Sequence, residues 1–164
     1  MFQTTYQLLT FFDYVEEIHG RKKLQKIIHL LKSAGSDFSF RYRYHHYGPY
    51  SAQLQGEIGL LVEQDFLEEK SGNGVYSYSI TETGRKFKNM LETKGDLSFQ
   101  LDEIILDKLV DENTSFLEMF STYVFLIESG DTRKQAEEKA TQLKPHLLDW
   151  LEKSIVAYEN YIVN

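Results

Sequence analysis

A change of hydrophobic period between residues 21 and 50 constrains the fold of this chain more than any other feature. The stretch "RKKLQKIIHLLKSAG" repeats its apolar residues at helical spacing, whereas "DFSFRYRYHHYG" alternates between two faces from one residue to the next. The aromatic content of the second stretch is typical of a strand. Gly48-Pro49 predicts the end of that strand, since proline lacks the N–H that a ladder requires. The sequence therefore predicts a strand over residues 38–47 that follows a helix.

The flanking segments complete a recognisable order of elements. Helical spacing covers residues 2–18 and 21–35, and Ser51 is placed to cap a helix that runs to Asp65. Two short strand-like runs then surround Gly72-Asn73-Gly74, which is a hairpin signal, and Thr81 caps a further helix. The order helix, helix, strand, helix, hairpin, helix predicts an N-terminal winged helix in an α+β, mainly helical protein.

Charge divides the chain near "LETKGDLS", residues 91–98. Residues 1–95 carry twelve Lys/Arg against eleven Asp/Glu, a net of +1, whereas residues 96–164 carry six against fourteen, a net of −8. The second part is helical in pattern, with a nearly all-apolar run over residues 115–128 and a break at Pro145. We expect a winged-helix-like domain at 1–95 and an acidic helical subdomain, a small bundle packed on it, at 96–164.

The composition excludes several classes of protein. The chain has no cysteine, so disulfides, thiol nucleophiles and iron–sulfur clusters are excluded, and a reducing compartment is favoured. No run of about 18 apolar residues is present to span a bilayer, and the N-terminus lacks the basic region of a signal peptide. We expect a cytoplasmic protein with no membrane partner.

Several motifs also resemble a known family. "GRKKLQKIIHLLK", "YHHYGPYS", "ITETGRKF" and "FLEMFSTYVFLIESGDT" resemble, in order and spacing, the bacterial YwgA-like proteins. The lysine-leucine-glutamine-lysine and glycine-proline elements are similar, more distantly, to the SocA-like "Panacea" domains found in antitoxins and phage-related proteins. The resemblance implies a winged-helix-like fold and brings no established activity.

The paired histidines do not predict a catalytic or metal site. His45 and His46 are adjacent, so on a strand they face opposite sides and cannot chelate one ion together. Ser51 has no nucleophile-elbow sequence around it, and the glycines at residues 72–74 precede no helix that could cradle a phosphate. A small hydrolase using His45 or His46 is the weakest hypothesis. We expect a non-enzymatic bacterial or phage protein without catalytic residues, cofactor or metal.

DNA binding is the first functional hypothesis. Basic residues gather at the start of the second helix and on the predicted strand, and two glutamines on the third helix can reach base edges. The third helix, however, has no Lys or Arg, which is a deficit because phosphate contacts supply much of the affinity. The candidate contacts to double-stranded DNA, in a regulatory role, are Arg21, Lys22, Lys23, Lys26, Arg41, Arg43, Gln53, Gln55, Lys70 and Asn73.

Protein binding is the alternative hypothesis. Tyr47, Tyr50 and Trp150 are of the residue types that anchor protein interfaces, although ordinary core packing is the favoured explanation for Trp150. In this alternative the chain is an antitoxin-like or anti-defence adaptor, and a second copy of the chain is a further candidate partner.

Overall fold

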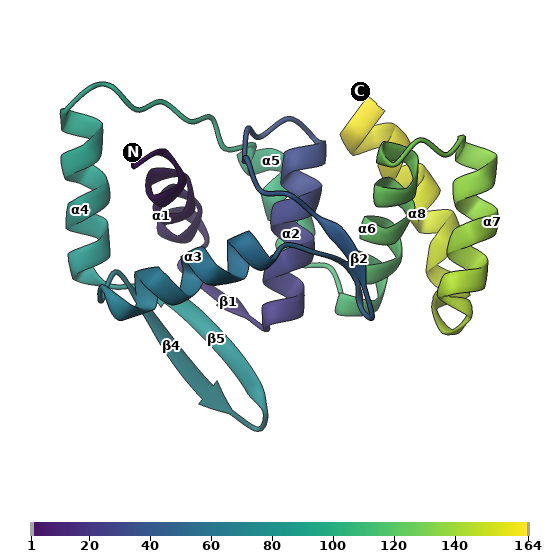
Figure 1. Ribbon diagram of the computed structural model, residues 1–164, viewed down its shortest axis with the longest axis horizontal. Helices are drawn as coiled ribbons and strands as arrows, with labels where there is room; N and C mark the ends of the chain where they lie inside the picture. The colour runs from purple at the N-terminus through teal and green to yellow at the C-terminus, as the bar shows by residue number, and fades with distance from the viewer. Residues whose placement is uncertain (1, 164) are drawn as a thin grey trace. The chain divides into compact units, whose positions relative to one another are not determined.

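The computed structural model describes residues 2–163 and is α+β and mainly helical, as predicted (Figure 1). Its elements in order are α1 (Gln3–Val15), β1 (Glu17–His19), α2 (Arg21–Ser33), β2 (Arg43–His45), β3 (Gly48–Tyr50), α3 (Ala52–Glu63), β4 (Leu67–Gly72), β5 (Val75–Ile80), α4 (Glu82–Thr93), α5 (Glu103–Val110), α6 (Thr114–Glu128), α7 (Arg133–Leu143), the 3-10 helix η1 (Pro145–Trp150), α8 (Leu151–Ala157) and the π-helix η2 (Tyr158–Val163).

The chain packs as two compact units that are discontinuous in sequence. Among the described residues, unit 1 holds 2–25, 36–41 and 51–101, and unit 2 holds 26–35, 42–50 and 102–163. Unit 1 carries nine Lys/Arg against twelve Asp/Glu, a net of −3, and unit 2 carries nine against thirteen, a net of −4. The charge difference between residues 1–95 and 96–164 is a property of the linear sequence. The two packed units do not show it, because both carry a net negative charge.

Unit 1 is built on an antiparallel sheet of three strands in the order β1-β5-β4. The predicted hairpin is confirmed, because β4 pairs with β5 through a turn in which Asn73 and Gly74 both have positive φ. Strand β1 was not predicted: α1 ends at Val15 instead of continuing to Ile18, because Glu16 turns the chain with a φ of 69°. Figure 1 shows the β4–β5 hairpin extending beyond the helices of its unit.

A network of charged hydrogen bonds joins α1 to α4 in the same unit. The Asp13 carboxylate accepts from Arg85 Nε at 2.8 Å and from Lys88 Nζ at 2.7 Å. Burial alone would raise the pKa of Asp13, but these two donors outweigh it and hold that pKa below its usual value. Lys88 also pairs with Glu92, which accepts a hydrogen bond from the Tyr6 hydroxyl. This network fixes the two helices beside each other.

The strand predicted over residues 38–47 is mostly wrong. Phe38 and Phe40 are buried but lie in an irregular segment, and only residues 43–45 form a strand. Gly48-Pro49 does not end the extended chain either, because both residues belong to β3, which pairs with β2. The turn at residues 46–47 closes because Gly48 adopts a φ of 95°, and Pro49 is tolerated opposite Tyr44 at a position that needs no N–H.

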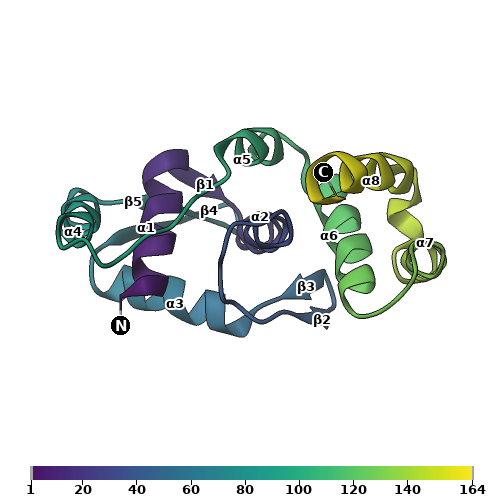
Figure 2. The same cartoon turned by 90° about the horizontal axis from the view of Figure 1, so that it is seen from above.

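Unit 2 is organised around α6, which is buried on nearly all sides, as its apolar sequence predicts. Figure 2 shows α7 and α8 beside it, and Met119, Tyr123 and Leu126 of α6 form one cluster with the small residues of α7. The two predicted caps are confirmed in unit 1, because the Ser51 and Thr81 side chains each accept a hydrogen bond at the start of a helix. In unit 2, Thr132 caps α7 in the same way.

Candidate functional site

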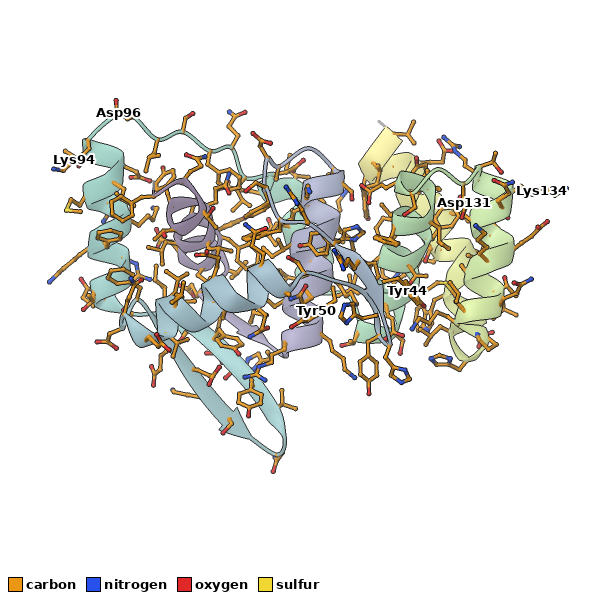
Figure 3. The ribbon with its side chains drawn as sticks, viewed as in Figure 1. Tyr44, Tyr50, Lys94, Asp96, Asp131 and Lys134 are labelled. Carbon is orange, nitrogen blue, oxygen red and sulfur yellow. The ribbon has the colours of Figure 1, made fainter. Side chains whose placement is uncertain are left out.

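The β2–β3 hairpin forms one wall of a pocket of about 540 Å³ in unit 2, here called the hairpin pocket. Tyr44 and Tyr47 are 36% and 47% exposed, and Leu143, which also lines the pocket, is 43% exposed. Figure 3 shows Tyr44 on β2 beside α6. The pocket is lined by Tyr44, His45, His46, Tyr47, Glu118, Leu143, Lys144 and His146. Aromatic walls with a few polar groups are what a binding site for a flexible ligand requires.

A buried ion pair forms the base of this pocket. Lys144 and Glu118 are 4% and 12% exposed, and the Lys144 Nζ lies 2.9 Å from a Glu118 oxygen. The same ammonium donates to the His46 backbone oxygen at 2.8 Å and lies 5.5 Å from the centre of the Tyr44 ring. Lys144 therefore holds the turn of the hairpin. Sequence reasoning missed both residues, because neither stands in a motif and only the fold brings them together.

A second buried lysine supports the other strand. Lys26 is 2% exposed and its Nζ donates to the Pro49 backbone oxygen at 2.8 Å. Its amine also lies 3.6 Å from where a Cβ on Gly48 would stand. Lys26, predicted as a DNA contact, is thus a buried support of the hairpin and does not present its charge to solvent.

Strand β2 has an open edge. The small sheet holds β2 and β3 alone among the described residues, so one side of β2 pairs with no strand. Tyr44 faces Pro49 in the register, and because proline has no N–H this is a non-hydrogen-bonded pair. The N–H and C=O of Tyr44 therefore point away from β3, toward the open edge. An extended peptide can pair with such an edge.

A cluster around His29 lies elsewhere in unit 2. His29 is 2% exposed; its Nδ1 lies 2.7 Å from the Ser121 Oγ and its Nε2 lies 3.0 Å from the Glu128 Oε1. Burial lowers the pKa of His29, against the opposing attraction of Glu128. Burial alone would raise the pKa of Glu128, but hydrogen bonds from His29 and Ser33 outweigh it and hold that pKa below its usual value. The cluster is a neutral histidine between a hydroxyl donor and a carboxylate.

This arrangement contains the residue types of a hydrolase triad but not its geometry. Ser121 is fully buried in the middle of α6, so a substrate cannot approach its hydroxyl. The backbone N–H groups around it belong to the helix ladder, so they cannot form an oxyanion hole. The cluster connects α2 to α6 within unit 2. Sequence reasoning missed it because His29 is part of an ordinary apolar helical pattern.

The His29 cluster gives the protein a predicted acid sensitivity. The unfolded chain takes up a proton on His29 near the ordinary pKa of 6.5, whereas the folded protein keeps this residue neutral to lower pH. The free energy of unfolding should therefore fall as pH drops from 7 through 6.5 and below. In His29→Gln this part of the pH dependence should disappear, as measured by urea unfolding between pH 7.5 and 5. Parallel curves for the two proteins would contradict the assignment.

The predicted DNA contacts on α2 are partly engaged within unit 1. Arg21 donates from Nε to the Tyr78 hydroxyl at 2.9 Å, stacks on the Tyr76 ring at 3.7 Å and lies 3.5 Å from a Glu69 oxygen. The positive charge of Arg21 is therefore partly neutralised by the Glu69 carboxylate. Lys22 is exposed and Lys23 is half-buried.

The remaining predicted contacts belong to different elements. Arg41 and Arg43 are both exposed, but Arg41 lies in unit 1 outside any strand and Arg43 lies in unit 2 on β2. On α3, Gln53 is exposed, whereas the half-buried Gln55 hydrogen-bonds to Tyr78. Lys70 and Asn73 are exposed on the β4–β5 hairpin. The outer face of α3 presents no cation.

The three predicted protein contacts all fall in unit 2. Tyr47 lines the hairpin pocket, and Tyr50 is half-buried with its ring 4.8 Å from that of His45. Figure 3 shows Tyr50 at the end of the same hairpin. Trp150 is half-buried against the helical cluster of α6, and its ring centre lies 6.3 Å from that of Phe116. Trp150 thus contributes to packing, and the hairpin carries the exposed aromatic residues.

Residues 2–163 contain neither a metal-ligand cluster nor a helix that could span a membrane. No group of three or more metal-ligating side chains is close enough to hold an ion in the described part of the chain. No helix within these residues combines the length and apolar character needed to span a bilayer.

The chain is similar over most of its length to a known bacterial protein. The chain is 35% identical over 142 residues to a protein of Bacillus subtilis (strain 168) described as uncharacterized protein YwgA. The match covers 84% of this chain and 82% of that protein. No protein-family model matches the chain.

Proposed function

The chain belongs to the YwgA-like family of bacterial proteins, and since its relative there is described as uncharacterized, we propose a function from the geometry of the site. The protein is a non-enzymatic adaptor that binds an extended, acidic segment of a partner protein along the β2–β3 hairpin. The observation that carries this proposal is the open edge of β2 beside exposed Tyr44 and Tyr47, above the buried Lys144.

The strand register supports the chemistry of this partner. Arg43 and His45 face one side of β2 and Tyr44 faces the other. A peptide strand added at the open edge would alternate in the same way, with acidic side chains beside Arg43 and His45 and apolar ones beside Tyr44. Glu118 is the pocket's carboxylate and is paired with Lys144, so the lining does not repel an acidic peptide. An adaptor role also accords with the distant resemblance to SocA-like antitoxin domains.

DNA binding is the second candidate, and the order of elements along residues 3–80 favours it. The order α1, β1, α2, α3, β4, β5 with the sheet order β1-β5-β4 is that of a winged helix, which we propose for this part of the chain. The absence of cations on the described face of α3, the engaged Arg21 and the net charge of −3 all weaken this candidate. We therefore place protein binding first.

Peptide selection distinguishes the two candidates. A random peptide display library panned on the protein should enrich sequences that alternate acidic and apolar residues. Tyr44→Ala with Tyr47→Ala should reduce the affinity of the enriched peptides at least about thirtyfold, since a pair of aromatic anchors contributes roughly 2 kcal/mol or more. The variant Ile104→Ala, which removes a 72% exposed side chain from α5, serves as the matched control and should bind normally.

Other results would contradict the adaptor proposal or support DNA binding instead. Enrichment of basic peptides, or equal binding by the double tyrosine variant, would contradict the adaptor proposal. Salt-dependent binding of double-stranded DNA that survives the tyrosine substitutions but is lost in Lys22→Glu with Lys70→Glu would instead support the second candidate.

A further inference from the structure

Three of the five histidines in the chain line the hairpin pocket. His45 ends β2, His46 stands in the turn that follows it, and His146 lies in η1. All three are exposed. Of the other two, His19 is on β1 of unit 1 and His29 is buried. Histidine is the side chain whose charge ordinarily changes between about pH 5 and 8, so the charge of this pocket changes in that range.

The lining of the pocket offers these histidines no spare carboxylate. Among the described residues its acidic member is Glu118 of α6, which is 12% exposed and lies 2.9 Å from the Lys144 Nζ. At the hairpin itself, Arg43 of β2 is exposed, and Lys26 of α2 donates to β3 from below. These groups are cations. Protonation of the histidines therefore adds positive charge that the pocket does not neutralise.

The helices packed against η1 do not supply a carboxylate to the pocket either. These helices are α6, α7 and α8. The last turn of α7, residues 140–143, carries no charged side chain. Asp149 of η1 and Glu152 of α8 are exposed, but neither lines the pocket, and Lys153 of α8 pairs with Glu112. A protonated His146 thus keeps its charge available to a ligand in the pocket.

We propose that the three histidines make binding of the acidic partner depend on pH, with an affinity that rises as the pH falls from about 7.5 to 5.5. This inference rests on the adaptor function proposed above. Each imidazole that takes up a proton adds positive charge beside the acidic side chains of the bound segment. By linkage the bound segment favours the charged imidazoles, so binding takes up protons. Aspartate in the partner stays charged throughout, because its ordinary pKa is about 3.9.

Calorimetric titration with an eight-residue peptide of alternating valine and aspartate, at pH 7.5 and 5.5, tests this inference. The affinity should rise about eightfold, since an exposed ion pair contributes roughly a factor of two and three imidazoles become charged. At pH 6.5, buffers of different ionisation enthalpy should report net proton uptake. Equal or weaker binding at pH 5.5 would overturn the pH dependence and leave the adaptor function standing. Absence of binding at both pH values would overturn both.

The triple variant His45→Gln, His46→Gln, His146→Gln tests the assignment to these residues. Within each protein the readout is the ratio of the affinities at the two pH values, and this ratio should fall to about one in the triple variant. His19→Gln is the matched control, because it removes a histidine whose side chain is 71% exposed from unit 1, and it should keep the full ratio. A triple variant that keeps the full ratio would overturn the assignment.

The imidazole resonances of the unaltered protein give a second readout, which does not depend on the variants. Followed by NMR against pH, His45, His46 and His146 should take up their protons at higher pH with the peptide bound than without it. His19 should titrate identically in the two samples. Titration curves of the three pocket histidines that do not move when the peptide is bound would refute the proposal.

Discussion

Gly84→Ala should destabilise unit 1 by about 3 kcal/mol or more, because the site has no room for a single methyl group. A Cβ on Gly84 would lie 2.2 Å from the Phe66 backbone oxygen. That oxygen also accepts from the Thr81 N–H at 3.0 Å, and Thr81 caps α4, so neither the carbonyl nor the helix can shift without loss of a hydrogen bond. Thermal or urea unfolding measures the loss.

Gly59→Ala provides the matched control for this substitution. Gly59 lies on the exposed side of α3, and nothing lies within 4 Å of the position that a Cβ would occupy. Alanine there should stabilise the helix by about 0.5–1 kcal/mol, since glycine in a helix interior has the greater conformational entropy to lose. Equal effects of the two substitutions would show that α4 does not pack against residue 66 as described.

Glu118→Ala should be the most damaging change in unit 2, with a predicted loss of about 3–5 kcal/mol. The substitution leaves the buried Lys144 ammonium with the His46 carbonyl as its sole described hydrogen-bond partner. An ammonium in this environment without a carboxylate is far less stable than in water. The hairpin pocket should lose its shape at the same time, because Lys144 holds the turn at residue 46.

A double-mutant cycle distinguishes the ion pair from simple packing. Glu118→Gln with Lys144→Met should be less destabilising than Glu118→Gln alone, since the second change removes the unpaired charge. Additive losses in chemical denaturation would mean that the two groups do not interact, which would contradict the buried pair.

The sequence predicts much of unit 1, because its signals are local. Helical periodicity, the Ser51 and Thr81 hydroxyls and the Asn73-Gly74 turn each determine their own segment without help from distant residues. The failure around residues 38–50 has the opposite cause. Alternation at Phe38 and Phe40 reflects burial of an irregular segment, and Pro49 is accommodated in a strand because a partner strand leaves its nitrogen unpaired.

The site was harder to predict because its charged residues lie far apart in the chain. The sequence draws attention to Tyr47 and Tyr50, which do lie on the hairpin, but not to Lys144, which reaches it from 98 positions away. For Lys26 the sequence was misleading in the opposite way. Its place in a basic cluster predicts a solvent-exposed side chain, but the fold buries it. The hydrogen bond between His29 and Glu128 could not be predicted from the sequence either, because it forms only when α2 packs against α6.

The most direct test of the adaptor proposal is an amide NMR titration with an eight-residue peptide of alternating valine and aspartate. The proposal predicts saturable shifts in residues 42–47 and 143–146, with a Kd below about 1 mM, and none with a peptide in which lysine replaces aspartate. A peptide with proline at its central positions should also fail, because it cannot pair with the edge of β2. Shifts confined to α3 and the β4–β5 hairpin, or none at all, would contradict the proposal.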